Sequence, residues 1–329
     1  MTERLRIGLV GLGDIAGQHV QVFSKEPDAE VTGVTDVDPA RLEARSRSWG
    51  VPAYADLEAL LPHVDAVVVC TPPTHHRAPT VRAAEAGVHV FCEKPVALSL
   101  EDADAMIVAC RGAGVILQIG MNFHFHPAYR AMWQLLQSGD LGELGSCWMR
   151  SFNLYPSSGW DQRRRQGHWR MRPEDSGGRL FEQIHLINWL HWIGGPVHSV
   201  FGRALTVAPD VPVDDLDLAV LNFERGFGVA ELALTPTTVN EASTGIIGTR
   251  GGISLHGARL LLRRQDAPQE IEIAPAPTPS RQRHFLDAIR AGRQPENDGP
   301  DGRMSLAACL AFMRSAREGR VVTLAEMEA

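Results

Sequence analysis

Short strand-like runs, most of them rich in hydrophobic residues, punctuate the first 120 residues of the chain, and stretches of mixed hydrophobic and polar residues separate them. Each run is four to six residues long, which is the length of a buried strand, and several of the intervening stretches have the period of an amphipathic helix. The runs span residues 5–10, 30–35, 65–70, 88–91 and 115–119. Strands that alternate with helices are joined by right-handed crossovers and pair in parallel. This part of the chain is therefore predicted to be an α/β domain with a parallel sheet.

The pattern changes from about residue 126. Helices are predicted over residues 130–137 and 179–190, and the other hydrophobic runs are predicted to be strands. These runs span residues 146–154, 197–207, 216–223, 228–234, 245–248, 252–255 and 259–262. Because no helices separate the later runs, we expect a largely antiparallel sheet with one face packed on helices and the other face open. The chain is thus predicted to form two domains, residues 1–125 and an α+β domain of residues 126–329.

A glycine-rich turn follows the first predicted strand and reads Gly-x-Gly-x-x-Ala. Gly11 allows the tight turn, Gly13 lets the backbone approach a pyrophosphate, and Ala16 lets the following helix pack closely on the strand. The first amides of that helix, at Asp14 and Ile15, are expected to hold the phosphates. The side chain of Asp14 would repel a phosphate, so we expect it to point away. The pattern predicts a doubly wound, dinucleotide-binding Rossmann domain.

Asp36 ends the second predicted strand, twenty positions after Ala16, where an acid that binds the adenosine ribose is expected. A carboxylate at this place holds the ribose hydroxyls and repels a 2′-phosphate, so NAD is favoured over NADP. Arg41 keeps NADP possible. The alternative interpretation of Asp36 is a turn residue that caps the next helix.

Composition narrows the function classes. The formal net charge of −7 argues against a nucleic-acid-binding protein, and the one basic cluster, around Arg163–Arg165, is short. The five cysteines are odd in number and include no C-x-x-C pair, which favours free thiols in a reducing cytosol over disulfides or a structural zinc site. No hydrophobic run approaches the ~18 residues of a membrane span. We expect a cytoplasmic, soluble protein.

Glu93, Lys94 and Pro95 follow the fourth predicted strand and so lie at the carboxyl edge of the sheet, where ligands of such sheets bind. Thr71 and Pro72 follow the third strand at the same edge. A partly desolvated lysine in this position can have a lowered pKa and exchange protons near neutral pH. The alternative is a surface turn with a solvated ion pair.

Glu182 and His185 are three residues apart on the predicted helix 179–190, so they are expected to share one face of it. A neighbouring carboxylate raises the basicity of an imidazole and can fix its tautomer, and Asn188 is the alternative partner. A histidine packed against the sheet remains possible. We expect no metal site, because the carboxylate-x-x-His pattern occurs once and a di-metal site needs two copies.

Several motifs together resemble the Gfo/Idh/MocA family, which includes glucose–fructose oxidoreductase and inositol dehydrogenase. They are Val-Gly-Leu-Gly-Asp-Ile-Ala at 10–16, Cys-Thr-Pro-Pro-Thr-His-His at 70–76, Ala-Gly-Val-His-Val-Phe-Cys-Glu-Lys-Pro at 86–95, the segment 122–127 and the ending 315–322. The resemblance implies a catalytic role for Lys94, a nicotinamide-ribose contact for Glu93 and a cis peptide bond at Pro95. It also implies that the cofactor is lined by Thr71, Pro72, His76 and Asn122.

In the second domain, the same resemblance implies that His185 is the general base, with Glu182 as a further catalytic residue. His124, Trp169 and Arg170 are expected to bind substrate. The family often has arginine where His124 stands, which weakens any inference about an anionic substrate. The open face of the second sheet is expected to form a homo-oligomer, either a dimer or a tetramer.

These features predict an NAD(P)-dependent oxidoreductase that moves a hydride between nicotinamide and a hydroxyl-bearing carbon of a sugar, polyol or related cyclic alcohol. Two alternatives stay open. One is a nucleotide-binding regulator without turnover. The other is a glycoside-processing enzyme that holds and recycles its NAD.

Overall fold

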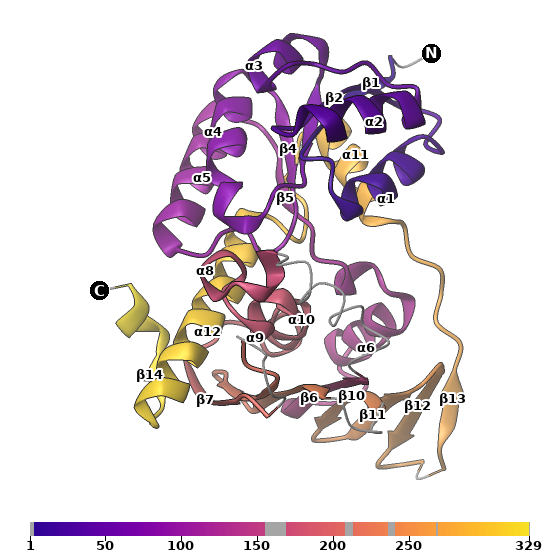
Figure 1. Ribbon diagram of the computed structural model, residues 1–329. Coiled ribbons are helices and arrows are strands. Elements are labelled where there is room, and N and C mark those ends of the chain that lie inside the picture. The colour runs from indigo at the N-terminus through magenta and orange to yellow at the C-terminus, as the bar shows by residue number, and fades with distance from the viewer. Residues whose placement is uncertain (1–2, 155–168, 208–212, 236–240, 268, 329) are drawn as a thin grey trace. The chain divides into compact units, whose positions relative to one another are not determined.

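The computed structural model describes residues 3–154, 169–207, 213–235, 241–267 and 269–328 (Figure 1). The predicted basic cluster at Arg163–Arg165 lies outside these ranges. Contacts divide the chain into two units, and each unit is discontinuous in sequence. Residues 1–121 and 279–303 form the first unit, and residues 122–278 and 304–329 form the second. The sequence had instead suggested a single division after residue 125.

The first unit contains a parallel five-stranded sheet in the order β2-β1-β3-β4-β5. Its strands are β1 (Leu5–Val10), β2 (Ala29–Thr35), β3 (Ala66–Val69), β4 (His89–Cys92) and β5 (Leu117–Ile119). The helices between them are α1 (Asp14–Phe23), α2 (Pro39–Trp49), α3 (Leu57–Leu60), α4 (Arg77–Glu85) and α5 (Leu100–Ala113). The predicted α/β architecture is confirmed, and each strand end lies within two residues of its predicted place.

Helix α11 (Arg281–Ala291) completes the core of the first unit although it lies far along the chain. Its Phe285 and Leu286 are fully buried in the same hydrophobic cluster as Ile7 and Phe91. The rings of Phe285 and Phe91 meet edge to face, with centroids 5.6 Å apart. The core of the first unit therefore includes a segment that the sequence pattern assigns to the second domain.

The second unit contains a nine-stranded sheet in the order β13-β12-β11-β10-β6-β9-β8-β7-β14. All neighbouring strands pair antiparallel except β6 and β9, which are parallel, so the predicted largely antiparallel sheet is confirmed. The strands are β6 (Leu144–Leu154), β7 (Ser199–Leu205), β8 (Leu216–Asn222), β9 (Phe227–Thr235), β10 (Glu241–Gly248), β11 (Gly251–His256), β12 (Arg259–Arg264), β13 (Ile271–Ile273) and β14 (Val322–Thr323). The short edge strands β13 and β14 were not predicted.

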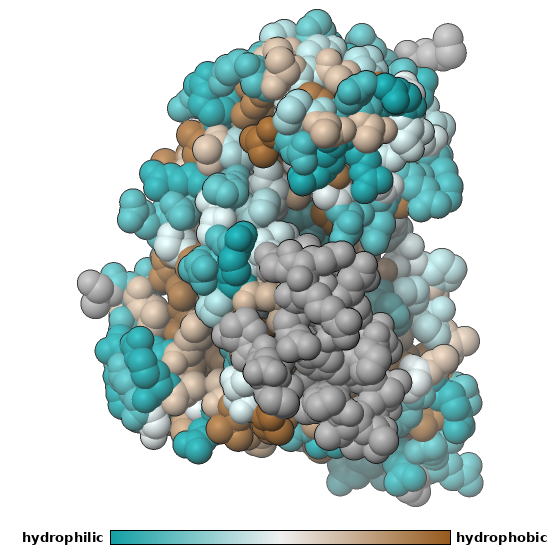
Figure 2. Space-filling view, viewed as in Figure 1, coloured by the Kyte–Doolittle hydropathy of each residue, from teal (hydrophilic) through white to brown (hydrophobic). Residues whose placement is uncertain are grey.

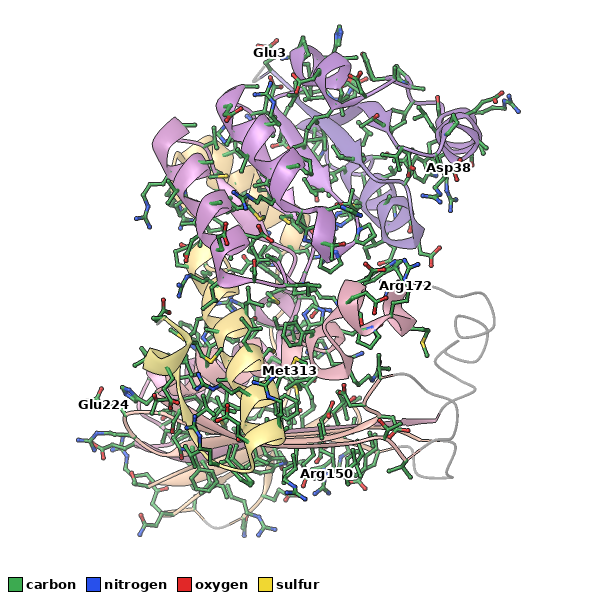
Figure 3. All side chains as sticks on the ribbon, turned by 60° about the vertical axis from the view of Figure 1, so that its left-hand side comes forward. Glu3, Asp38, Arg150, Arg172, Glu224 and Met313 are labelled. Carbon is green, nitrogen blue, oxygen red and sulfur yellow. The ribbon has the colours of Figure 1, made fainter. Side chains whose placement is uncertain are left out.

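Helices cover one face of this sheet. Helix α10 (His185–Gly194) packs on β6 and β9, and α6 (Pro127–Gln137) packs on β10. Helix α12 (Gly299–Glu318) brings Phe312 against Gly202 of β7. Figure 3 shows Arg150 on the opposite side of the sheet from Met313 of α12, on the face that these helices leave open.

Shorter helical segments precede α10: η5 (Trp169–Met171), α8 (Pro173–Ser176) and α9 (Arg179–Glu182). None of the described helices has the length and apolar character needed to cross a membrane. On the face shown in Figure 2, hydrophilic residues cover most of the described surface of the first unit, with hydrophobic residues visible in small areas between them.

Candidate functional site

The glycine turn between β1 and α1 has the geometry that a dinucleotide requires. Gly11 has φ of +84°, and a Cβ there would lie 2.9 Å from the backbone nitrogen of Thr71, so no other residue fits without strain. Gly13 caps α1 without a side chain, and apart from its neighbours in the chain no described atom lies within 4 Å of the place where its Cβ would be. The first amides of α1 are thus accessible to an anion. The side chain of Asp14 is exposed.

Asp36 lies immediately after β2 and is almost fully buried, with 7% of its surface exposed. Its carboxylate accepts hydrogen bonds from the backbone N–H groups of Leu12 at 2.7 Å and Asp38 at 2.8 Å, and it pairs with Arg41 at 3.2 Å. The cap of α2 is Asp38, which accepts from the amides of the first turn. Asp36 therefore does not cap the helix, but it is a turn residue, because it accepts from the backbone N–H two positions further along.

The turns after β3 and β4 are joined by His76, which is fully buried. Its Nε2 lies 2.8 Å from the carbonyl oxygen of Thr71, and its Nδ1 lies 2.9 Å from that of Pro95. Burial lowers the pKa of His76, while the two carbonyl groups oppose that shift. The peptide bond between Lys94 and Pro95 is cis, as predicted. His76 thus supports the turn that carries Lys94.

Glu93 is buried beside Lys94 and contacts three other groups of the first unit. Its Oε1 lies 2.8 Å from Nε2 of His19 and 3.0 Å from Nη1 of Arg281, and its Oε2 accepts from the backbone N–H of Lys94 at 3.2 Å. Burial alone would raise the pKa of Glu93, but Arg281 and His19 hold it well below its usual range. Glu93 is an ionised carboxylate within the unit.

Neither His19 nor Arg281 was identified from the sequence. His19 is a buried position of an amphipathic helix, where a histidine carries no motif of its own. Arg281 lies 188 residues beyond Glu93, and no local spacing links the two positions. The return of α11 to the first unit is what brings them together.

In the second unit, the predicted helix 179–190 is wrong, because it is divided into α9 and α10. Gln183 leaves the helical conformation, with φ of −99° and ψ of 28°. Glu182 therefore ends one helix and His185 begins the next, so they do not share a helix face. Glu182 pairs with Arg170 at 3.1 Å and with Arg179 at 3.2 Å.

His185 is half-buried at the start of α10, and its ring centroid lies 5.3 Å from that of Phe123. Asn188 is fully buried, and its side-chain amide donates to Ser305 Oγ at 3.2 Å. The same hydroxyl lies 3.0 Å from Nε2 of His191. Asn188 is therefore engaged with Ser305 on the side that faces α12.

The predicted substrate-binding residues lie in different surroundings within the second unit. His124 is fully buried and stacks on Trp192, with ring centroids 4.2 Å apart. Arg170 lies over the ring of Trp169 at 4.4 Å, and both side chains are half-buried. Asn122, which was expected to contact the cofactor, is exposed at the start of this unit. Over the described ranges, no group of three or more His, Cys, Asp and Glu residues could hold a metal ion.

Comparison with known proteins agrees with this geometry. The model of an oxidoreductase family with an NAD-binding Rossmann fold, GFO_IDH_MocA, matches residues 5–121. The GFO/IDH/MocA C-terminal domain matches residues 129–254. The chain is 30% identical to 1,5-anhydro-D-fructose reductase of Ensifer adhaerens, over 97% of this chain and 98% of that protein. This chain belongs to the Gfo/Idh/MocA family.

Two further similarities extend over the whole length. D-apiose dehydrogenase of Paraburkholderia graminis is 29% identical over 99% of this chain and 92% of that protein. The crystal structure of an oxidoreductase from Agrobacterium radiobacter, in complex with NAD+, L-tartaric acid and magnesium, matches with a TM-score of 0.86 at 25% identity. That match covers 98% of this chain and 99% of the other. This Gfo/Idh/MocA member is therefore a nicotinamide-dependent oxidoreductase, with its dinucleotide-binding features in the first unit.

Proposed function

We propose that this enzyme transfers a hydride between NAD and a hydroxyl-bearing carbon of a sugar, a polyol or a related cyclic alcohol. The observation that carries the proposal is the place of Lys94, in the turn after β4, at the same sheet edge as the glycine turn after β1. The names of the relatives, D-apiose dehydrogenase and 1,5-anhydro-D-fructose reductase, support this substrate class.

The cofactor, when bound, supplies the hydride chemistry. The residues that would hold it are the glycine turn, with Gly11 and Gly13 at the phosphates, and Asp36 at the adenosine ribose. Thr71 and Pro72 would line the nicotinamide side. The open backbone at Gly13 fits the pyrophosphate of an NAD molecule, and the carboxylate of Asp36 lies at the end of β2, where the ribose-binding acid of this fold is expected.

The proton transfers fall to side chains of the chain itself. Lys94 would donate a hydrogen bond to the reacting oxygen and stabilise negative charge on it. His185 would take the hydroxyl proton during oxidation and return it during reduction. Trp169 would stack on the ring of a sugar, and Arg170, held by Glu182, would bind its hydroxyls.

The two units would then divide the work, with cofactor binding in the first and substrate binding and oligomer formation in the second. We place the enzyme in the cytoplasm. Its five cysteines are buried free thiols, which suits a reducing compartment.

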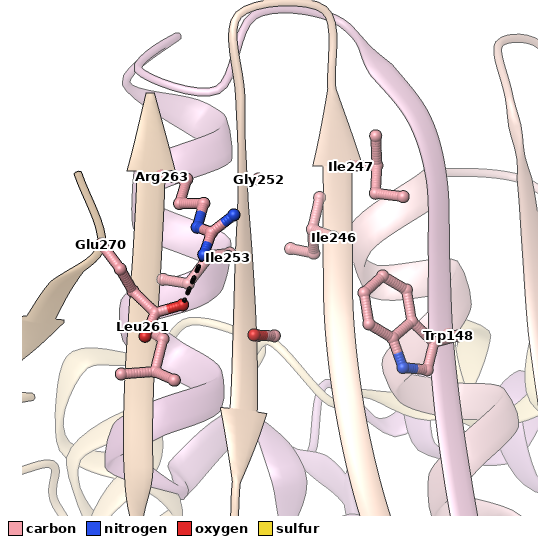
Figure 4. Close-up of a pocket in the computed structure, with 9 residues that line it drawn as sticks. Trp148, Ile246, Ile247, Gly252, Ile253, Leu261, Arg263 and Glu270 are labelled. Carbon is pink, nitrogen blue, oxygen red and sulfur yellow. Dashed lines mark ion pairs between the residues drawn. The ribbon is translucent and has the colours of Figure 1, made fainter. Parts of the chain in front are cut away.

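The open face of the second sheet supports a homo-oligomer. A row of half-buried hydrophobic side chains crosses four adjacent strands on this face, formed by Phe201, Val220, Val229 and Trp148. Figure 4 shows a hollow beside Trp148, bordered by the exposed Ile247 and by the ion pair of Arg263 and Glu270. Such a continuous hydrophobic surface is typical of an interface.

The oligomer is tested by light scattering of the Val229→Arg variant, which should have a lower mass than the wild type. Val108→Arg is the control, since Val108 is 69% exposed on α5 in the first unit. A wild-type mass for Val229→Arg would contradict the interface.

The activity is tested with a panel of sugars, inositols and sugar acids, by following the near-ultraviolet absorbance of the reduced cofactor. Reduction of NAD⁺ by members of this panel would support the proposal. Conversion of a glycoside without added NAD, by protein purified with bound cofactor, would instead favour the recycling alternative. Cofactor binding with no turnover of any compound would favour a regulator.

A further inference from the structure

Arg281, the first residue of α11, is placed against the acidic neighbour of Lys94. Its Nη1 lies 3.0 Å from Oε1 of Glu93 and donates to the carbonyl oxygen of Gly120 at 2.7 Å. The guanidinium also lies over the ring of Phe91, at 5.5 Å from the ring centre. Only 14% of the Arg281 side chain is exposed. The ion pair is therefore shielded from solvent, where it is worth more than a surface pair.

Gln282 constrains the Glu93 carboxylate indirectly, through His19. Gln282 is the neighbour of Arg281, and its side-chain amide lies 3.2 Å from Nδ1 of His19. If that amide donates to Nδ1, His19 carries its proton on Nε2 and donates it to Glu93 at 2.8 Å. Two consecutive residues of α11 thus fix the carboxylate, one directly and one through His19.

Glu93 in turn holds the backbone of Lys94, since its Oε2 accepts from the Lys94 N–H at 3.2 Å. A Cβ at Gly120 would lie 3.0 Å from the Glu93 carboxyl carbon, so the absence of a side chain there lets the carboxylate occupy this position. A change in the position of Glu93 would therefore displace the backbone at Lys94.

The charges around Glu93 come from several elements. The titratable groups that interact with it are His19, His76, Cys70, Cys92, Arg281 and Lys94. Burial lowers the pKa of both histidines and raises the pKa of both thiols, so these four groups are neutral near pH 7. Among these groups, Arg281 makes the ion pair with the Glu93 carboxylate, at 3.0 Å.

We propose that Arg281 is a positioning residue for Lys94, because it balances the charge of Glu93 and fixes the carboxylate that holds the backbone N–H of Lys94. This inference rests on the proposed role of Lys94. Without Arg281, the negative charge of Glu93 would be less balanced, which favours the protonated form of the Lys94 amine and would raise its pKa.

Two lysines occur in the whole sequence, Lys25 and Lys94, which makes the proton affinity of Lys94 directly measurable. Amine acylation as a function of pH, read by mass spectrometry on enzyme without cofactor, reports the two lysines separately. Lys25 is exposed on the segment after α1 and serves as the internal reference.

Three variants separate positioning from stability. In Arg281→Gln we expect the Lys94 titration to move up by about one pH unit with Lys25 unchanged, and kcat to fall about 10- to 100-fold. We also expect faster amide hydrogen exchange in the peptide that contains Lys94. Arg281→Lys keeps the charge and should recover much of kcat. Arg283→Gln is the matched control, because Arg283 lies on the same helix and pairs with Glu26 and Asp28 instead.

The inference is overturned if Arg281→Gln leaves the Lys94 titration and exchange as in the wild type, or if Arg283→Gln shifts them equally. A failure of the proposed function has a different signature. In that case Lys94→Ala would retain normal turnover, whatever the titration of Lys94 in Arg281→Gln.

Discussion

Asp36 accepts a hydrogen bond from the backbone N–H of Leu12, at 2.7 Å. This bond joins the end of β2 to the middle of the glycine turn after β1. The residue proposed to select the cofactor therefore also fixes the turn proposed to hold its phosphates. A substitution at this position should change both properties.

The first prediction concerns cofactor choice. Asp36→Ser removes the charge that repels a 2′-phosphate and breaks the pair of Asp36 with Arg41 at 3.2 Å, so that Arg41 keeps only its pair with Asp38 among the described ion pairs. We expect the preference for NADH over NADPH to narrow, as measured by the ratio of the two dissociation constants in fluorescence titrations. Adding Arg41→Ala should weaken NADPH binding again. An unchanged ratio in Asp36→Ser would remove the assignment of Asp36.

The second prediction concerns the proposed proton transfers. Lys94→Ala and His185→Asn should each lower kcat by ~10²–10⁴-fold, which is typical for the loss of a general acid or base. Cofactor affinity should change little. If both residues act on the same step, the double variant should lose much less than the product of the two single losses. A variant of either residue with near-normal kcat would exclude that residue from the chemistry.

Much of the fold followed from local pattern. Continuous hydrophobic runs locate buried parallel strands well, because both faces of such a sheet are covered. The edge strands β13 and β14 have three and two residues, too few to show a period. The helix 179–190 was overextended, since its hydrophobic pattern continues through the break at Gln183.

The proposed site could be predicted only in part from the sequence, because some of its residues meet through contacts between distant segments. Gly11, Asp36 and Lys94 lie at the ends of strands, so a strand assignment places them at one edge. Arg281 contributes through a contact between distant segments, and no period or spacing encodes such a contact. The same holds for the return of α11, because an amphipathic helix pattern does not specify the sheet on which it packs.

The third prediction tests that return. Phe285→Ala should lower the free energy of unfolding by about 3–5 kcal/mol, because Phe285 is fully buried against Phe91 and its truncation leaves a cavity. Met313→Ala on α12 is the control, since Met313 is 44% exposed and should change stability by less than about 0.5 kcal/mol. Both are measured by urea unfolding. Equal effects would show that α11 is not part of the core.

The fourth prediction concerns Asp217 of β8, which is 2% exposed. Burial raises the pKa of Asp217 to about 10, and the neighbouring carboxylate of Asp214 adds to the shift. Near neutral pH this side chain is therefore protonated in the folded enzyme, whereas it is ionised in the unfolded chain.

The sign of the pH dependence follows from the proton count. From about pH 4 to about pH 10 the folded state binds one more proton at Asp217 than the unfolded state does, so its contribution to stability falls as the pH rises. Asp217→Asn imitates the protonated form at every pH, so it removes the contribution of Asp217 to the pH dependence of stability. Between pH 5 and pH 8 we expect the free energy of unfolding of the variant, measured with urea, to rise relative to that of the wild type by up to about 1.4 kcal/mol per pH unit. Asp266→Asn, at an exposed position, should follow the wild-type curve. Parallel curves for Asp217→Asn and the wild type would mean that Asp217 is ionised in the folded enzyme.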